Sequence, residues 1–305
     1  MVVFAQVHYL DVWRKIGASL ARRMSVPFDL VVTTSHDPAS IFRPRTRHLR
    51  SFRVQVVENR GRDVLPFLRA LAEAPDFEIG LKIHTKKSPQ RADGAQWLAL
   101  LLASLLPSKR GVRDIVARMA ADPRIGFVAP HGFCLPVKPW VLQNGAAMEA
   151  VMADIGHSLS DADMVDAYFA AGNMFWFRRD ALGMLAAESL PALFESEAAQ
   201  LDGTVAHAME RVFPVEARRQ GYLTVAMPAL LASDPAQPAA AIITATRLHT
   251  EEPNFLFPAP YVSPASAEFK PPMREQLLQA IMPFVGRVPR PLRRIVGIVV
   301  RGGRR

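Results

Sequence analysis

Short apolar runs alternate with amphipathic stretches along the first half of the chain. Such runs predict strands, and apolar residues at helical spacing predict helices. The predicted strands cover residues 2–7, 28–34, 52–57 and 77–84, and the predicted helices cover residues 12–24 and 64–73. Alternating strands and helices are typical of an α/β fold with a mostly parallel sheet and helices on both faces.

The same pattern continues in the second half and then stops. Helices are predicted at residues 113–121, at 181–187 and from about 203, and strands at residues 125–129, 172–178 and 221–227. After residue 231, Pro, Ala and Ser dominate, and proline interrupts any long element. We therefore predict an α/β domain over residues 1–231 and an irregular, Pro-rich extension with a basic amphipathic tail over residues 232–305.

Charge and cysteine content narrow the class of protein. The formal net charge is +9, but seven arginines lie after residue 286, so part of this charge belongs to the tail. Such a tail can lie on anionic lipid or stay free in solution. The single cysteine, Cys134, excludes an intramolecular disulfide and a zinc site of several thiolates. The basic residues are not interleaved with aromatics, so we expect no nucleic-acid partner.

No membrane-spanning or secretory segment is predicted. The apolar run at residues 98–106 is shorter than the roughly 20 residues that a spanning helix needs. The first residues lack a basic leader and a small-residue cleavage site, and they are more typical of a first core strand. A reducing, cytoplasmic location is therefore expected.

Polar side chains follow three of the predicted strands, where each strand ends. They are Ser35-His36-Asp37, the sequence NRGRD at residues 59–63, and His84-Thr85-Lys86-Lys87. Because the carboxyl ends of parallel strands meet at one edge, these groups should converge, and their positive charges suit phosphate. Each group also has a structural alternative: the lysines can be a solvated loop, Arg60 a surface charge and Asp63 the cap of the next helix.

Four motifs occur in a characteristic order. They are NRGRD at residues 59–63 with Pro66-Phe67, KIHTKKS at 82–88, GNMFWFR at 172–178, and QLDGT at 200–204 followed by His207 and Glu210-Arg211. Together they resemble the rhamnan synthesis protein F family over about residues 1–230. The resemblance implies a glycosyltransferase of GT-A-like, Rossmann-like fold. It would move a sugar, rhamnose by the family name, from a nucleotide-diphosphate donor to a cell-surface polysaccharide or O-antigen.

The resemblance also suggests how the donor is bound. In related GT-A enzymes an Asp-x-Asp at this strand end holds a divalent metal against the diphosphate, but here His84-Thr85-Lys86 stands there. A metal needs anionic oxygen ligands, so we expect no metal and no cofactor. The donor-binding residues expected on the phosphates are His84, Lys86 and Lys87, and those expected around the nucleoside are Asp37, Asn59, Arg60 and Asp63.

An inverting transferase needs a carboxylate base, because a sugar hydroxyl is a poor nucleophile. The positions that match related enzymes are Glu197 and Asp202, and Asp202 is favoured because it precedes a helix. Capping of that helix is the structural alternative. Weaker candidates on the acceptor side are His131, His207 and Arg178.

Two structural alternatives concern the aromatic strand. Arg178 at its end could pair with Glu210 inside the fold or bind phosphate. The strand itself, Phe175-Trp176-Phe177, is more typical of a core than of a sugar-binding platform.

The implied partners are a nucleotide sugar and a lipid-linked or oligosaccharide acceptor. The protein would work in the cytoplasm, with peripheral contact to the inner membrane through the basic tail. The missing Asp-x-Asp leaves a second interpretation open. In it, the chain is a non-catalytic or partner-dependent module of a polysaccharide assembly complex.

Overall fold

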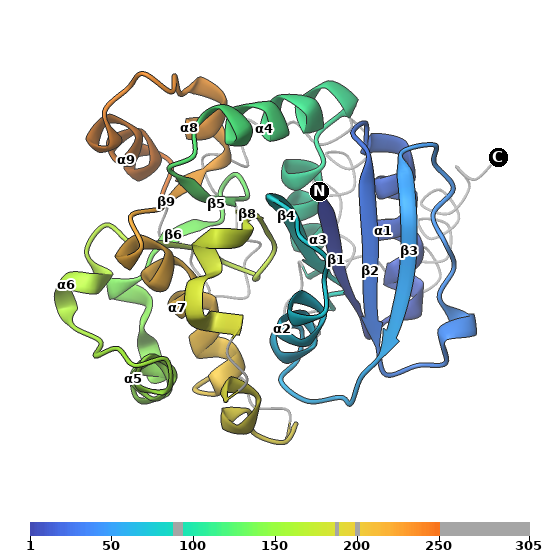
Figure 1. Cartoon of the computed structure of the whole chain (residues 1–305), viewed down its shortest axis with the longest axis horizontal. Coiled ribbons are helices and arrows are strands. Elements are labelled where there is room, and N and C mark those ends of the chain that lie inside the picture. Colours follow the sequence, from blue (N-terminus) through green and yellow to red (C-terminus); the bar gives the residue numbers. More distant parts are fainter. Residues whose placement is uncertain (88–93, 187–188, 199–201, 251–305) are drawn as a thin grey trace, which may run out of the picture. The chain divides into compact units, whose positions relative to one another are not determined.

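The computed structural model describes residues 1–87, 94–186, 189–198 and 202–250. In these residues a seven-stranded sheet forms the centre of the fold (Figure 1). The strands in spatial order are β3 (Leu49–Val56), β2 (Phe28–Thr34), β1 (Val2–Val7), β4 (Ile79–His84), β8 (Phe175–Arg178), β5 (Ile125–Ala129) and β9 (Leu223–Ala226). Every neighbouring pair is parallel except the two that involve β8, which runs antiparallel to β4 and β5. The predicted α/β fold with a mostly parallel sheet is confirmed.

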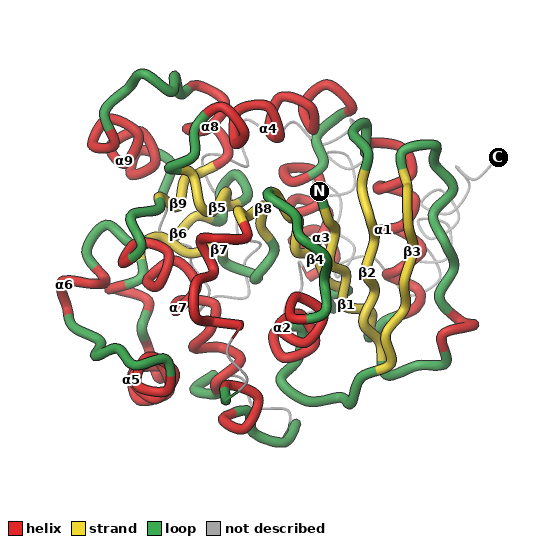
Figure 2. The backbone as a smooth tube through the Cα atoms, viewed as in Figure 1, coloured by secondary structure: helices red, strands yellow, loops and turns green. Residues whose placement is uncertain are grey.

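Helices cover both faces of this sheet, as Figure 2 shows with strands in yellow and helices in red. The longer helices are α1 (Leu10–Arg23), α2 (Val64–Ala72), α3 (Gly94–Leu105), α4 (Lys109–Ala121) and α7 (Val205–Arg219). In Figure 1, α1 and α3 lie behind the sheet and α2 and α7 lie in front. Each helix turns an apolar face to the strands; α1, for example, buries Trp13, Ile16 and Leu20.

Several smaller elements were not predicted from the sequence. They are strands β6 (Cys134–Pro136) and β7 (Tyr168–Ala170), helices α5 (Gly145–Asp154), α6 (Asp161–Met164), α8 (Met227–Ala232) and α9 (Ala239–Leu248), and 3-10 turns η1 (Pro38–Ser40), η2 (Lys138–Trp140), η3 (Leu142–Asn144) and η5 (Leu190–Leu193). The helix predicted at residues 181–187 is the 3-10 segment η4 (Arg179–Ala186), which is kinked at Gly183. The two short strands pair antiparallel outside the main sheet. Most of these elements are too short to show a clear hydrophobic period.

The part of the chain after residue 231 differs from its expected irregularity. Helix α9 lies within it and packs on the end of the sheet: Ile242 is buried, and the Thr246 hydroxyl accepts a bond from the Ala226 amide at 3.4 Å. The residues beyond 250, including the predicted basic tail, lie outside the described residues. No helix in the described part of the chain is both long and apolar enough to span a bilayer.

The aromatic strand is part of the core, as the sequence indicated. Strand β8 begins at Phe175 rather than at residue 172, because Gly172 and Asn173 adopt positive φ angles of 95° and 56° and form a turn. The Phe177 ring packs edge-on against Phe67 at 5.5 Å between centroids. This strand therefore holds the two halves of the sheet together and offers no exposed aromatic platform.

Candidate functional site

The carboxyl edge of the parallel strands carries the polar groups that the sequence predicted to converge. The ends of β1 and β4 are tied together there, because the Thr85 hydroxyl accepts bonds from the amides of His8 and Tyr9 at 2.8 and 3.0 Å. Since β8 is antiparallel, the turn at Gly172 and Asn173 that precedes it reaches the same edge. The candidate site is built from these strand ends and from the start of α7.

A buried lysine lies at the centre of the site. The side chain of Lys82, in the middle of β4, is only 2% exposed, and its ammonium group pairs with the Asp63 carboxylate. The same group donates to the main-chain carbonyl of Asn173 at 2.8 Å and lies 5.5 Å from the centroid of the Phe67 ring. An unpaired charge at this depth would be very costly, so the lysine depends on Asp63 as its counter-ion.

Asp63 faces this lysine and does not cap α2. It occupies the N-cap position of α2, but its side chain makes no capping hydrogen bond, so the predicted cap is wrong. Its Oδ2 accepts from the Asn173 side-chain amide at 2.7 Å as well as from Lys82. Burial opposes ionisation of Asp63, but the charges of His84, Lys82 and Lys86 outweigh it and lower the pKa of Asp63 below its usual value. Asp63 is therefore a carboxylate at neutral pH.

His84 ends β4 directly beside this pair. Its side chain is 7% exposed, and its Nδ1 lies 3.4 Å from Asp63 Oδ2 without forming a hydrogen bond. Burial, together with the charges of Lys82 and Lys86, lowers the pKa of His84 to about 3 despite the opposing effect of Asp63. His84 is thus a neutral imidazole at physiological pH.

The two lysines after β4 diverge. Lys86 is half-buried, and its ammonium group lies 4.2 Å from the centroid of the Trp97 ring. Its charge still acts on both Asp63 and His84. Lys87 is exposed and pairs with Asp11 of α1 at 2.9 Å, so of the two lysines only Lys86 belongs to the buried cluster.

The NRGRD turn contacts the segment before α7. Gly61 has a φ of 65°, and a Cβ there would lie 2.5 Å from Leu65 Cβ, so the turn requires glycine. Arg60 donates to the carbonyl of Pro191 at 3.0 Å, and the Arg62 amide donates to Glu197 at 3.0 Å. Glu197, one of the two predicted base candidates, therefore lies against this turn.

Besides Lys87, two more of the predicted donor-binding residues are not part of the cluster. Asp37 is exposed after β2, and its Oδ1 accepts from the Ala39 amide at 2.9 Å, which caps η1. Asn59 is also exposed. The structure places both on the same edge of the sheet as the cluster but brings neither into contact with Asp63.

The start of α7 carries the second base candidate. Helix α7 begins at Val205 with Thr204 at its N-cap, and the Val205 amide donates to the Glu195 carboxylate at 3.1 Å. The alternative that Asp202 caps this helix is therefore wrong. Asp202 Oδ1 accepts from the Asn144 side-chain amide at 2.9 Å, which holds the carboxylate in place.

The first turns of α7 connect Asp202 to the cluster. Burial and the charge of Arg62 lower the pKa of His207 to about 4, and the carboxylates of Asp202 and Asp63 oppose this shift. The charges of Arg62, Asp202 and Asp63 therefore all act on His207. One turn later, Glu210 accepts from the Gly172 amide at 2.7 Å and so fixes the turn that presents Asn173.

The other two acceptor-side candidates lie away from the cluster. Arg178 lies at the opposite end of β4, where it pairs with Glu78 and donates to the carbonyl of Met119. The prediction that Arg178 pairs with Glu210 is therefore wrong. His131 follows β5 on the carboxyl edge, where its amide donates to the Ser104 hydroxyl at 2.6 Å and its ring lies 6.4 Å from that of His249.

Sequence reasoning missed several residues that organise the site. They are Lys82, Asn173, Glu195, Asn144 and Glu210. Only Lys82 carried a signal in the sequence, because a lysine between two apolar residues of a core strand has to find a counter-charge. The partners of the others come from distant segments.

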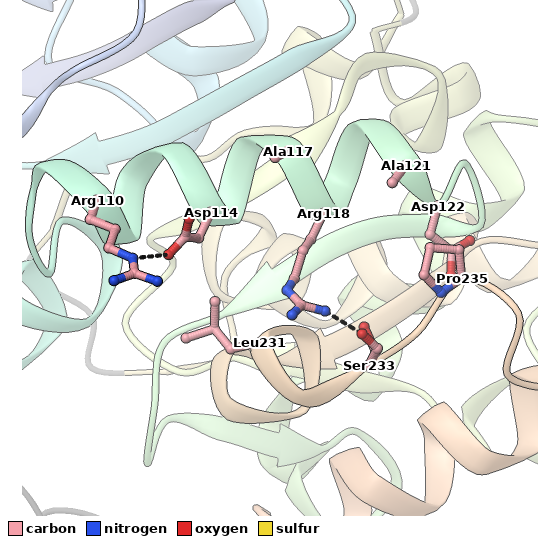
Figure 3. Close-up of a pocket in the computed structure, with 9 residues that line it drawn as sticks. All are labelled: Arg110, Asp114, Ala117, Arg118, Ala121, Asp122, Leu231, Ser233 and Pro235. Carbon is pink, nitrogen blue, oxygen red and sulfur yellow. Dashed lines mark hydrogen bonds and ion pairs between the residues drawn. The ribbon is translucent and has the colours of Figure 1, made fainter.

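A separate groove of about 590 Å³ lies between α4 and the segment after α8 (Figure 3). It is lined by Arg110, Asp114, Ala117, Arg118, Ala121, Asp122, Leu231, Ser233 and Pro235. Arg118 donates to the Ser233 carbonyl, and Arg110 lies 3.7 Å from Asp114. None of the residues of the cluster lines this groove, so it is not part of the candidate site.

The arrangement at the carboxyl edge suits an anionic ligand. Among the residues that the structure describes, no three His, Cys, Asp or Glu side chains are grouped to hold a metal ion. The one carboxylate beside His84 is Asp63, which already neutralises Lys82. Lys86 supplies positive charge beside the neutral His84 imidazole, which is chemistry for phosphate or sugar hydroxyls.

Comparison with known proteins gives a consistent result. A family model described as rhamnan synthesis protein F matches residues 1–222, which contain all the residues of the cluster. Two curated relatives, each named "Uncharacterized protein WxcX" and from two strains of Xanthomonas campestris pv. campestris, are 41% identical over 172 residues. The matched part is 55% of this chain and 24% of each relative, so the chain spans about a quarter of the relatives' length.

Proposed function

From the premise that this chain belongs to the rhamnan synthesis protein F family, we propose that it is a glycosyltransferase of GT-A-like fold. The proposed reaction moves a sugar from a nucleotide-diphosphate donor to a growing cell-surface polysaccharide or O-antigen. The family name suggests rhamnose as the sugar. The acceptor would be lipid-linked or an oligosaccharide, used at the cytoplasmic face of the inner membrane.

The observation that carries this proposal is the arrangement at the end of β4. A related GT-A enzyme would place metal-binding carboxylates there, whereas this chain places neutral His84 and the cation Lys86 beside an Asp63 that is already paired. Lys86 and Arg62 would neutralise the leaving diphosphate through charge-assisted hydrogen bonds, worth about 1.5–3 kcal/mol each. The His84 imidazole, at the end of β4, would bond a phosphate or sugar oxygen. Donor binding would therefore need no metal.

Asp202 is the proposed general base. Its Oδ1 is held by Asn144, and its Oδ2 makes no hydrogen bond to any described residue, so one oxygen is free to accept a proton. As the acceptor oxygen bonds to the anomeric carbon, its proton would pass to Asp202 and the nucleotide diphosphate would leave from the opposite face. A single displacement of this kind inverts the anomeric configuration.

Nucleotide binding tests the donor site. The purified chain is heated with dTDP, UDP or GDP, each in EDTA and then in magnesium. A ligand at about 100-fold over its dissociation constant stabilises the fold by about 2.7 kcal/mol. We expect one nucleotide to raise the melting temperature in EDTA. Stabilisation only in magnesium would contradict metal-independent binding.

The variant Asp202→Asn tests the base. It should keep the nucleotide-dependent stabilisation but lose sugar transfer, because an amide cannot take the proton. The matched control is Glu197→Gln, whose carboxylate is engaged by the Arg62 amide. If Glu197→Gln lost sugar transfer and Asp202→Asn kept it, Glu197 and not Asp202 would be the general base.

A second candidate function follows from the length of the relatives. Because the chain covers only 24% of each, the matched part could work as a non-catalytic or partner-dependent module of a larger assembly protein. Absence of stabilisation by every nucleotide under both conditions would favour this module.

A further inference from the structure

One stretch of the chain contains arginines and no acidic residue. Between Asp37 and Glu58 there are five arginines and no carboxylate. Three of the arginines, Arg43, Arg45 and Arg47, lie on the loop between η1 and the edge strand β3, and all three are exposed. The loop therefore presents closely spaced positive charges to solvent.

The loop is held rigidly against α1. The Trp13 side chain donates to the carbonyl of Phe42 at 3.2 Å, and the two rings lie 5.6 Å apart. Pro44 is buried, and a Cβ at Gly17 would lie only 2.6 Å from the Phe42 ring. Phe42 itself remains 40% exposed. The loop thus presents an apolar side chain at a fixed position among its arginines.

The neighbouring face of α1 continues the positive surface. Its exposed positions carry Arg14, Lys15 and Arg22, and Arg14 directly follows the Trp13 that contacts the loop. The one carboxylate on this face, Asp11, is paired with Lys87 at 2.9 Å. We use the term basic face for the six residues Arg14, Lys15, Arg22, Arg43, Arg45 and Arg47.

The charges of the basic face are not used inside the fold. Within the described part of the chain, Arg14, Lys15, Arg22, Arg43 and Arg45 form no hydrogen bond or ion pair. Arg47 contacts only the neighbouring His48, at 3.5 Å. A group of cations that the fold does not neutralise raises the local positive potential and attracts a polyanion.

We propose that the basic face binds the anionic headgroups of a lipid bilayer, with Phe42 entering the interface. The face adjoins the candidate site, because Lys87 follows the end of β4 and pairs with Asp11 at the start of α1. A protein held by this face would keep the site close to a lipid-linked acceptor, and in this respect the proposal rests on the proposed function. The contact belongs to the folded domain and is separate from the basic tail.

Lipid fits the basic face better than nucleic acid does. Single-stranded nucleic acid is held by several aromatic rings on which successive bases stack. The basic face offers one exposed ring, Phe42, surrounded by arginines. One apolar anchor with several cations is the usual composition of a peripheral contact with anionic lipid.

The test is binding of the full chain to vesicles in the absence of nucleotide. Vesicles of phosphatidylcholine alone are compared with vesicles that also contain phosphatidylglycerol. At about 1 kcal/mol for each arginine near an anionic surface, the variant Arg43→Gln/Arg45→Gln should bind the anionic vesicles about 30-fold more weakly than the unchanged chain. The matched control, Lys138→Gln/Arg218→Gln, removes the same charge from η2 and α7 and should bind normally.

Equal binding of both double variants to the anionic vesicles would overturn the proposal. Binding of a single-stranded oligonucleotide that depends on Arg43 and Arg45, without binding to vesicles, would also overturn it. Both variants should also keep the nucleotide-dependent stabilisation, since neither changes the cluster at β4. If no nucleotide stabilises the chain but Arg43→Gln/Arg45→Gln loses vesicle binding, the basic face stands and the transferase proposal falls.

Discussion

At the scale of single residues, the site is organised by the buried pair of Lys82 and Asp63. The lysine is almost completely excluded from water, and the carboxylate is its only ionic partner among the described residues. Breaking a buried pair by removing one charge is far more costly than removing both. Asp63 is therefore committed to holding Lys82, and this explains why the carboxylate of the NRGRD motif points into the sheet instead of capping α2.

The variant Asp63→Asn should lower the free energy of unfolding by about 3–5 kcal/mol, because it leaves the ammonium group of Lys82 buried without a counter-charge. Urea denaturation followed by circular dichroism measures this change. The control Asp76→Asn removes an exposed carboxylate that lies 3.5 Å from Arg179, and it should cost at most about 1 kcal/mol.

The double variant Asp63→Asn/Lys82→Met separates charge from shape. It removes both members of the pair, so it should recover most of the stability that Asp63→Asn loses. If the double variant were less stable than Asp63→Asn, the burial of the Lys82 ammonium group would not depend on the charge of Asp63.

His84 should make the stability of the protein depend on pH. Its pKa falls from 6.5 to about 3 on folding, so the folded chain binds fewer protons than the unfolded chain between these values. Stability is therefore lost as the pH falls through this window. Between about pH 7 and about pH 5 the unchanged chain should lose about 2 kcal/mol more than His84→Gln. Urea denaturation at both pH values measures the difference.

The control for this experiment is His48→Gln, which changes a half-exposed histidine before β3. If His84→Gln and His48→Gln had the same pH dependence, the burial of His84 would not be its cause.

At the scale of elements, the fold depends on the contact of β8 with β4. Strand β8 runs antiparallel between two parallel strands, and its aromatic side chains fill the space under α2 and α7. Gly80 of β4 makes room for the Phe177 ring, since a Cβ at that position would lie 2.4 Å from it. The absence of a side chain at residue 80 thus decides how closely the two strands pack.

The variant Gly80→Ala should lower the free energy of unfolding by about 1–3 kcal/mol, because the added methyl group displaces a ring in a closely packed core. The control is Gly145→Ala at the first residue of α5, where a Cβ would meet Val141 at an ordinary 3.5 Å. This control should not lower stability, since alanine favours the helix. Thermal unfolding of both variants measures the difference, and equal losses would contradict the packing argument.

At the scale of the whole described molecule, one sheet and one continuous set of buried side chains join the two halves of the chain. Strands β1 and β4 are paired on both sides and covered by helices, whereas β3 has one neighbour and several exposed side chains. The candidate site therefore lies on the best protected strands of the sheet. The loop of the basic face leads into the edge strand β3.

Hydrogen exchange should follow this order. Amides of β1 and β4 should exchange only through global unfolding, and those of β3 should exchange faster through local opening. Exchange followed by mass spectrometry measures the rates for each peptide. Equal protection of β3 and β4 would show that the edge of the sheet is covered in solution.

The sequence by itself determined the regular part of this protein. Apolar runs predicted β1, β2 and β5 to the residue, and the order of strands and helices predicted the mostly parallel sheet, because both depend on local patterns. The four sequence motifs indicated the family. The positions of the strand ends predicted that NRGRD and His84 would meet at the carboxyl edge of the sheet.

Only the tertiary structure decided what each polar group does there. Asp63 is bound by Lys82 and Asn173, and Arg178 pairs with Glu78. At the start of α7, Glu195 accepts the amide bond that the capping alternative assigned to Asp202. Each of these partners lies on another segment of the chain. No local pattern can specify such a partner, because a buried charge is satisfied by whichever group the fold brings within reach.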